Sequence, residues 1–348
     1  MQMEKIKAGI IGASGYAGAE LVRILLTHPQ AEIAGISARS YLGQSVKKLY
    51  PGLNKATELV FEEEDIVIEK SDIIFASLPH GLSENIAKKC IEQGKRFIDL
   101  GADFRLEKEE EYNAWYHQSY NEKELHEESV YGLSEIHRDS IKTARIIGNP
   151  GCYPTSIALG CYPALKAGIV NTEHLIIDSK SGTTGAGKEP KENTHFPRTN
   201  EAFAPYGVAK HRHTPEIEQM LTEVAGEEVK ITFVPHLLPI NRGIISTIYL
   251  PLKETLDLQK IYEIYEEAYK DETFVRLLEL GETADLKFVK YSNYCDISLH
   301  LDERCKTLVV VACIDNMVKG AAGQAIQNMN LMCGFPEDTG LGFIAPSF

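Results

Sequence analysis

Residues 6–18 read Ile-Lys-Ala-Gly-Ile-Ile-Gly-Ala-Ser-Gly-Tyr-Ala-Gly, and they are the main evidence for the fold of the first part of the chain. Ile6–Ile11 has the short apolar pattern of a buried strand, and a helix-period pattern follows over about Ala17–Leu26. The glycines between them are spaced G-x-x-G-x-x-G. A strand, a glycine-rich turn and a helix in this order predict the first unit of a dinucleotide-binding parallel sheet.

The glycine turn is expected to hold a pyrophosphate. Glycine lets backbone N–H groups approach the phosphates, and the start of a helix adds a favourable electrostatic field. The candidate cofactor-binding residues of this turn are Gly12, Ser14, Gly15, Tyr16 and Gly18. The spacing differs from the commoner G-x-G-x-x-G, so a tight turn without a ligand is the alternative.

The next strand pattern, Ala31–Ser37, should end beside the adenine ribose. An NAD site usually places Asp or Glu there, whereas this chain continues with Ser37, Ala38, Arg39 and Ser40. An arginine suits a 2′-phosphate because it donates charge-assisted, bidentate hydrogen bonds. Ser37 and Arg39 therefore predict NADP rather than NAD, and a surface arginine without a ligand is the alternative.

Strand patterns alternate with helix-period stretches over the first hundred residues. This alternation predicts βαβ units in a parallel sheet with right-handed crossovers. The further elements expected here are a strand at Asp72–Ser77, a helix at about Leu82–Gln93 and a strand at Lys95–Leu100. The turn after the strand at 72–77 contains Pro79 and His80, and both are expected near the cofactor.

The character of the sequence changes after Pro150. Apolar strand patterns then follow one another with fewer helices between them, which predicts an α+β domain with a mainly antiparallel sheet. The strand candidates are His174–Ser179, Val229–Val234, Gly243–Leu250, Tyr294–Leu301 and Thr307–Asp315, and a last helix is expected over about Lys319–Met332. Ser181–Lys210 has little periodicity, and a loop of this length is usually either functional or disordered.

We therefore expect an α/β protein of two domains. Residues 1–150 and 318–348 would form a Rossmann-type NADP-binding domain, and residues 151–317 would form the catalytic and oligomerisation domain. The chain of 348 residues is 43% hydrophobic, which is enough to build two large cores.

The composition excludes several classes of partner. A formal net charge of −14 gives no general attraction to nucleic acid or to acidic membranes. The sequence has no apolar run long enough to span a membrane, and its start lacks the pattern of a signal peptide. Seven scattered cysteines without a C-x-x-C pair favour a reducing cytoplasm over a disulfide framework, and they predict no metal site.

Gly148–Ser156 reads Gly-Asn-Pro-Gly-Cys-Tyr-Pro-Thr-Ser and contains the candidate nucleophile, Cys152. A helix is expected from near Pro154, because proline is favoured in a first helical turn. The positive end of a helix dipole lowers the pKa of a nearby thiol and so makes thiolate available for attack. The alternative is a small buried cysteine, like Cys161.

A second run, Lys210–Ile217, reads Lys-His-Arg-His-Thr-Pro-Glu-Ile. Thr214 can cap a helix whose first residue is Pro215, which would hold His213 rigidly just before the helix. An imidazole in that setting can take the proton of a thiol and deliver one to a leaving group. The alternative is a basic patch that binds phosphate or a second subunit, and His211 within it is a candidate substrate-binding residue.

Taken together, these stretches resemble the N-acetyl-γ-glutamyl-phosphate reductase family, which is related to the aspartate-semialdehyde dehydrogenases. The resemblance covers essentially the whole chain, and the runs around Cys152 and His213 are the most specific. The matching segments are Gly12–Leu21, Leu78–Ser83, Leu100–Leu106, Gly148–Thr155, Ser181–Lys188, His211–Ile217, Pro239–Gly243 and Asp315–Gln324.

The resemblance implies a reaction. In this family NADPH reduces N-acetyl-γ-glutamyl phosphate to N-acetylglutamate 5-semialdehyde and releases phosphate, a step of arginine biosynthesis. Cys152 would attack the acyl phosphate and form a thioester, and His213 would be the acid–base. Arg105 matches a position near the substrate phosphate, and a helix-start arginine paired with Asp103 is the alternative. Arg242 is a weaker candidate for a substrate carboxylate.

The resemblance also implies cofactor contacts and assembly. Ser181 and Gly182 begin a segment similar to the family's glycine-rich loop near the active site. Asn316 and Gly320 belong to a segment that packs near the nicotinamide in the family. The family forms homo-oligomers, so a homotetramer or a homodimer is expected, and the partner of the site is a small acyl phosphate.

Two other functions fit parts of the sequence. A sister reductase, acting on aspartyl phosphate or on a carrier-linked aminoadipyl phosphate, would share the cysteine, the histidine and NADP. The run around His213 favours the N-acetylglutamyl branch over the aspartyl one, and the net charge of −14 argues against a basic surface for a carrier protein. A non-catalytic NADP sensor should lose the nucleophile or the base, whereas this chain has both.

Overall fold

The computed structural model describes residues 5–347, and the chain divides into two compact units. Unit 1 consists of Met1–Pro150 and Ala321–Phe343, and unit 2 consists of Gly151–Gly320 and Ile344–Phe348. Each unit contains its own seven-stranded sheet. Within residues 5–347, none of the helices is long and apolar enough to cross a membrane.

Unit 1 is built on a parallel sheet whose strands follow the order β3-β2-β1-β4-β5-β7-β6. The order of the strands reverses between β1 and β4, and open parallel sheets bind their ligands at the carboxyl ends of the strands at such a point. The parallel sheet predicted from the sequence is confirmed. The strands are β1 (Ile6–Ile11), β2 (Ala31–Ser37), β3 (Phe61–Glu62), β4 (Ile73–Ala76), β5 (Arg96–Asp99), β6 (Val130–Tyr131) and β7 (Ile146–Gly148).

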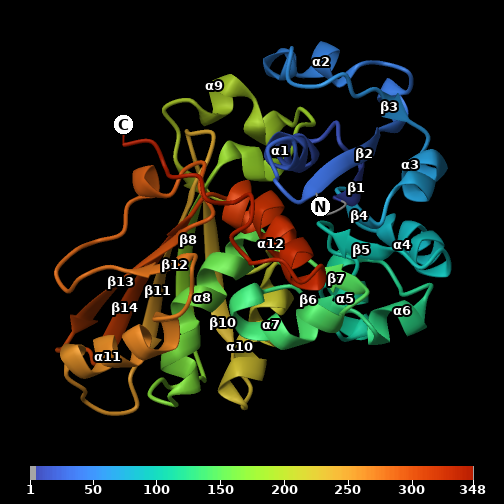
Figure 1. The fold of residues 1–348 in the computed structure, drawn as a ribbon. Coiled ribbons are helices and arrows are strands. Elements are labelled where there is room, and N and C mark those ends of the chain that lie inside the picture. Colours follow the sequence, from blue (N-terminus) through green and yellow to red (C-terminus); the bar gives the residue numbers. More distant parts are fainter. Residues whose placement is uncertain (1–4, 348) are drawn as a thin grey trace. The chain divides into compact units, whose positions relative to one another are not determined.

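Helices cover both faces of this sheet (Figure 1). Helices α1 (Tyr16–Leu25) and α12 (Gly323–Met332) lie on one side, and α3 (Glu64–Lys70) and α4 (Ser83–Glu92) lie on the other. The second pair buries an apolar stripe, which includes Val67 and Ile86, against the strands. The remaining helices of unit 1 are η1 (Arg39–Tyr41), α2 (Val46–Leu49), η2 (Pro51–Leu53), α5 (Glu109–Tyr116), α6 (Lys123–Glu127) and α7 (Ser134–Thr143).

The last helix differs from its prediction at one end and agrees at the other. The segment expected to be one helix from Lys319 starts as a π-helix, η6 (Val318–Ala322), and becomes α-helical at Gly323. At the other end, Gly334 follows the C-cap residue with a φ of 72°, the left-handed conformation that ends many helices.

Unit 2 contains a mixed, mainly antiparallel sheet with the order β12-β13-β14-β11-β8-β10-β9. The mainly antiparallel character predicted for this part of the chain is confirmed, with parallel pairing only between β8 and β10 and between β12 and β13. The strands are β8 (Leu175–Gly182), β9 (Ala204–Pro205), β10 (Ile231–Leu238), β11 (Ile244–Pro251), β12 (Val275–Leu277), β13 (Cys295–Asp302) and β14 (Thr307–Ile314).

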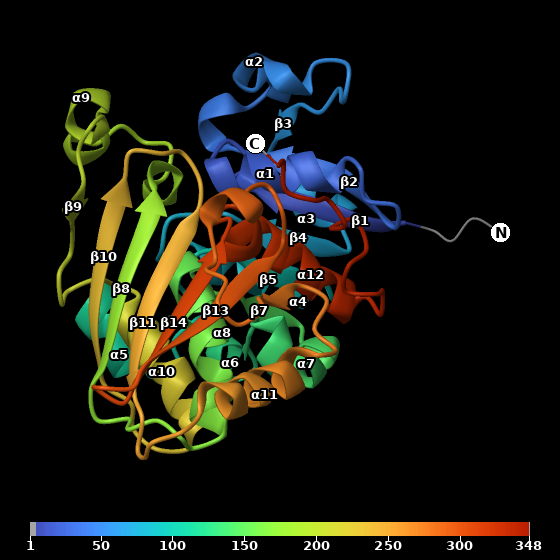
Figure 2. The same cartoon turned by 90° about the vertical axis from the view of Figure 1, so that its left-hand side faces the viewer.

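One face of this sheet carries α8 (Cys152–Lys166), flanked by α10 (Thr214–Ala225) and α11 (Leu258–Tyr269) (Figure 2). A chain of buried hydroxyl groups fixes the start of α8 on the strands. Ser156 Oγ lies 2.8 Å from Ser246 Oγ on β11, which lies 2.8 Å from Ser179 Oγ on β8. The shorter helices of unit 2 are η3 (Thr183–Ala186), η4 (Glu192–Thr194), α9 (Phe196–Thr199) and η5 (Leu286–Phe288).

Candidate active site

In the glycine turn of unit 1, two glycines lie so close to neighbouring backbone atoms that a side chain would not fit. Gly12 has a φ of 85°, and a Cβ on it would lie 2.2 Å from the carbonyl oxygen of Ser77. A Cβ on Gly18 would lie 2.5 Å from the carbonyl oxygen of Gly12. Gly15 is the N-cap residue of α1, so the turn ends at a helix N-terminus. Ser14 and Tyr16 lie in the same turn, which has the form of a pyrophosphate site.

The end of β2 lies beside this turn. The Ser37 carbonyl accepts hydrogen bonds from the N–H groups of Gly12 at 2.9 Å and Ala13 at 3.0 Å. Arg39 follows in η1 with an exposed side chain, and its Nε lies 3.1 Å from Oε1 of Glu64 on α3. No local pattern indicates Glu64 as the partner of Arg39, because the two residues are 25 positions apart. An arginine that could bind a 2′-phosphate therefore already has an acidic partner in the folded chain.

Cys152 is the first residue of α8. Gly151 is the N-cap residue with extended backbone, so the helix begins two residues before the expected start near Pro154. The thiol is half-buried and belongs to the first turn, where the positive end of the helix dipole favours an anion. The expectation that Cys152 lies at a helix N-terminus is met, and only the position of the boundary was wrong.

Two other segments of unit 2 contact the start of α8. A Cβ on Gly320 would lie 2.7 Å from Cβ of Cys152, so only glycine fits there. Glu216, a buried residue in the first turn of α10, accepts a hydrogen bond from the Gly151 N–H at 2.7 Å through Oε1. Sequence reasoning missed Glu216, although it lies in the run around His213. Its partner is 65 residues away and no local pattern indicates the contact.

Tyr153 joins the start of α8 to both candidate histidines. Its buried ring packs edge-on against His211 and His213, with ring centroids 5.5 Å and 6.0 Å away. Its hydroxyl lies 3.0 Å from the hydroxyl of Tyr206. Tyr153, which follows Cys152 in the chain, is thus a neighbour of the imidazoles of His211 and His213 within unit 2.

His211 and His213 differ in their setting. His213 is the N-cap residue of α10, with Thr214 and Pro215 as its first two helical residues. The expectation that Thr214 caps the helix was therefore wrong by one residue. The N–H of His213 donates to Nδ1 of His211 at 3.1 Å, which leaves Nε2 to carry the proton of a neutral ring. Burial, with a smaller effect from Arg212, lowers the pKa of His211 to about 4, so its ring is uncharged at neutral pH.

The two candidate arginines lie in different units. Arg105 is buried in unit 1, where its guanidinium donates to the backbone carbonyls of Asn149 and Leu100, each at 2.8 Å. Arg242 belongs to unit 2, with its guanidinium 5.0 Å from the ring centroid of Tyr291. Nη1 of Arg242 lies 3.7 Å from Oδ1 of the buried Asp315.

The remaining candidate cofactor-binding residues lie in segments held mainly by hydrogen bonds and close contacts with the backbone. A Cβ on Gly182 would lie 2.5 Å from the Asn241 carbonyl oxygen, so this segment also requires glycine. The Asn316 amide accepts from the Gly243 N–H at 2.8 Å and donates to Oγ1 of Thr184 at 3.0 Å. Ser181 Oγ donates to the Gly182 carbonyl at 3.0 Å. Pro79, in unit 1, is exposed in the turn after β4.

The two units match two family models of one class. The model described as "Semialdehyde dehydrogenase, NAD binding domain" matches residues 7–144. The model described as "Semialdehyde dehydrogenase, dimerisation domain" matches residues 152–316. The protein is therefore an oxidoreductase of the semialdehyde dehydrogenase class, with an NAD(P)-binding domain and a second domain of the dimerisation type.

Relatives that match over their full length identify the family within this class. A protein of Brachyspira hyodysenteriae named N-acetyl-gamma-glutamyl-phosphate reductase is 55% identical, and the match covers 99% of this chain and 100% of the relative. A protein of Clostridium beijerinckii with the same name is 54% identical over 99% of this chain and 100% of the relative. The chain belongs to the N-acetyl-γ-glutamyl-phosphate reductase family, as the resemblance in sequence indicated.

Solved structures of related enzymes share the fold. The aspartate semialdehyde dehydrogenase II of Vibrio cholerae, complexed with ASA, has a TM-score of 0.74 and 14% identity, and covers 95% of this chain and 99% of that chain. The enzyme of Candida albicans with NADP has a TM-score of 0.70 and 16% identity over the same shares of the chains. At these identities the likeness concerns the architecture alone.

Proposed function

We propose that the protein reduces N-acetyl-γ-glutamyl phosphate to N-acetyl-L-glutamate 5-semialdehyde with NADPH in the cytoplasm, as a step of arginine biosynthesis. The first-turn position of Cys152, with the neighbouring Tyr153 packed against His211 and His213, is the observation that carries the proposal. The full-length relatives bearing this name support the choice of substrate. Free thiols at all seven cysteines suit a reducing compartment.

In this mechanism Cys152 Sγ attacks the acyl carbon, the bond to the phosphate oxygen breaks, and a thioester forms. His213 takes the thiol proton and delivers it to the leaving phosphate. Bound NADPH supplies the hydride that brings the thioester to the aldehyde level. The Cys152 thiolate then leaves as the aldehyde forms, and it is favoured by the α8 N-terminus.

Binding roles follow from the same proposal. Arg105 would bind the substrate phosphate, and Arg242 and the neutral His211 would bind the rest of the substrate. The glycine turn and the end of β2 would hold NADP, with Arg39 on the 2′-phosphate. Pro79, Ser181, Gly182, Asn316 and Gly320 would border the cofactor. In these roles Ser181 and Asn316 act indirectly, because their side chains hydrogen-bond to the backbone of Gly182 and Gly243.

The proposed assembly is a homodimer or a homotetramer. The description of the family model over residues 152–316 as a dimerisation domain supports it. The sheet of unit 2 also places Ile176 and Tyr249 opposite each other on β8 and β11, and both side chains are about two-fifths exposed, at 43% and 38%. A face with exposed large apolar side chains is suited to a second copy of the chain.

The reverse reaction tests the proposed function. Wild type and Cys152→Ser are incubated with N-acetylglutamate semialdehyde, NADP⁺ and phosphate, and NADPH formation is followed by absorbance. We expect a rate that requires phosphate in the wild type and no rate in the variant. Activity with aspartate semialdehyde instead would assign the protein to the sister reductases. Inactivity with both aldehydes in a protein that binds NADPH would indicate a carrier-linked substrate or a sensor.

A further inference from the structure

The turn between β4 and α4 adjoins the glycine turn of unit 1. Its first residue, Ser77, donates its N–H to the Ile11 carbonyl at 2.8 Å, and its own carbonyl oxygen occupies the space where a Cβ on Gly12 would lie. Further along, Pro79, Gly81 and Leu82 are exposed. The turn thus begins against the candidate pyrophosphate site and presents an exposed backbone beyond it.

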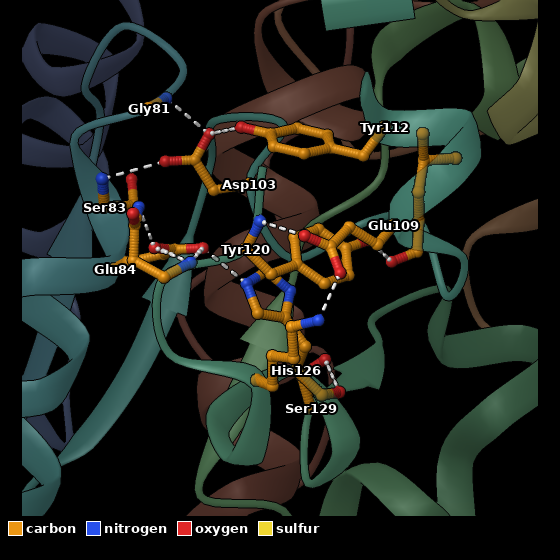
Figure 3. A network of polar contacts seen from close by, with 12 residues as sticks. Gly81, Ser83, Glu84, Asp103, Glu109, Tyr112, Tyr120, His126 and Ser129 are labelled. Atoms are coloured by element: carbon orange, nitrogen blue, oxygen red, sulfur yellow. Dashed lines mark hydrogen bonds and ion pairs between the residues drawn. The ribbon is translucent and has the colours of Figure 1, made fainter. Parts of the chain in front are cut away.

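Asp103 holds the far end of this turn (Figure 3). Its side chain is fully buried at 0% exposure. Oδ1 accepts the Gly81 N–H at 2.7 Å and Oδ2 accepts the Ser83 N–H at 2.9 Å. Both carboxylate oxygens therefore bind backbone donors of one turn that is 20 residues or more distant in sequence.

Asp103 is itself held from the other side. The hydroxyl of Tyr112, on α5, donates to Oδ1 of Asp103 at 2.7 Å. Burial and the Asp103 charge raise the pKa of Tyr112, so its hydroxyl remains a donor. The neighbouring Asp99 accepts the Ser83 hydroxyl at 2.6 Å. A network of buried acceptors thus fixes the positions of Gly81 and Ser83.

We propose that Asp103 is a positioning residue for the nicotinamide half of the bound cofactor. In parallel sheets of this type the adenine ribose lies at the end of β2, on the far side of β1 from β4. The turn after β4 therefore borders the other half of the dinucleotide, and Asp103 sets its backbone. This inference rests on the proposed use of NADPH.

Asp103→Asn is the sharpest variant. It nearly keeps the shape, but an amide has one acceptor oxygen and one NH₂ group, so either the Gly81 or the Ser83 N–H must face a donor. We expect NADPH to bind roughly tenfold more weakly or worse, since an unsatisfied buried donor is costly. Adenosine 2′,5′-bisphosphate, which occupies only the β2 side, should bind as it does to the wild type.

Both dissociation constants are measured by titration calorimetry on the full chain. Glu84→Gln is the matched control, because Glu84 is buried in the same network but binds Asn121 and His126 instead of the turn. It should leave the ratio of the two constants unchanged. Equal weakening of NADPH and the fragment by Asp103→Asn would mean a general structural role and would overturn the inference, as would unchanged NADPH binding.

A second variant covers the case in which Asp103→Asn does not fold. Gly81 has a φ of 85°, and a Cβ on it would lie 3.2 Å from the Gln118 amide group, so Gly81→Ala distorts the turn and leaves the carboxylate in place. The same selective loss of NADPH binding is expected, and its absence would overturn the inference. Failure of the wild type to bind NADPH would instead overturn the proposed function, and the inference with it.

Discussion

Arg39 and Glu64 form an ion pair beside the candidate site for the adenine ribose. Hydrogen bonding to Glu64 and its charge raise the pKa of Arg39, which stays a cation. A 2′-phosphate would have to compete with the Glu64 carboxylate for the same guanidinium donors. The choice between NADPH and NADH therefore depends on two residues, of which the sequence pattern indicates only one.

We expect Arg39→Gln to raise KM for NADPH by about 10- to 100-fold and to leave KM for NADH nearly unchanged, because charge-assisted hydrogen bonds to the phosphate are lost. Initial rates with both cofactors measure this. Glu64→Gln is the control and should lower KM for NADPH, since it removes the competing carboxylate. Equal losses with both cofactors in Arg39→Gln would contradict a role for Arg39 at the 2′-phosphate.

The half-buried ring of His211 makes the free energy of unfolding depend on pH. Its pKa is about 4 in the folded chain, and an unfolded histidine titrates near 6.5. Between these values the unfolded chain binds a proton that the folded chain does not. His211 therefore costs no stability above about pH 6.5. The free energy of unfolding falls as the pH drops toward 4, by roughly 3 kcal/mol at most.

His211→Asn should flatten the dependence of stability on pH between 6.5 and 4, because asparagine does not titrate. Urea unfolding followed by fluorescence at several pH values measures it. His174→Asn, at an exposed position, is the control and should leave the slope close to that of the wild type. A His211→Asn slope as steep as that of the wild type would show that other groups cause the loss.

Among the elements, α8 and α10 are joined at their first turns. The Glu216 carboxylate lies at the N-termini of both helices, where a negative charge is favoured, and it binds the N–H of the residue before Cys152. Through this bond the helix that carries His213 fixes the start of the helix that carries Cys152.

We expect Glu216→Ala to lower the free energy of unfolding by about 1–3 kcal/mol, because it leaves the buried Gly151 N–H without its acceptor. It should also reduce kcat about tenfold by loosening the start of α8. Glu216→Gln keeps an acceptor oxygen and should recover most of the stability. Thermal unfolding and steady-state rates measure both effects, and a Gln variant as impaired as Ala would contradict the hydrogen-bond argument.

The longer strands could be predicted from the sequence, because their patterns are local, whereas helices such as α3, α7 and α11 were not expected. The strand Ala31–Ser37 agrees to the residue, and α1 and α4 each differ from their expected bounds by one residue at both ends. The parallel pairing of β8 with β10 and the short strands β9 and β12 could not be predicted, since strand order depends on packing between distant segments. The contacts of Glu64 and Glu216, and those of Asp103 with Gly81 and Ser83, were missed for the same reason.

At the scale of the whole molecule, unit 2 has one sheet face under helices and a second face that exposes Ile176 and Tyr249. We expect Ile176→Glu with Tyr249→Glu to reduce the size of the particle in solution, because charges would be buried without partners at the interface. Light scattering after size-exclusion chromatography measures it. Glu223→Lys on α10, on the helical face, is the control, and an unchanged double variant would place the interface elsewhere.

The contact between Gly320 and Cys152 also bears on how such a protein could be modified. Gly151 and Gly320 are the first and last residues of the main segment of unit 2, and the contact brings both ends of that segment together. A segment whose two ends are adjacent can be inserted into another domain, because the two connections to that domain then lie side by side. Residues 151–320 are therefore suited to exchange as one segment between related reductases, with both junctions beside Cys152.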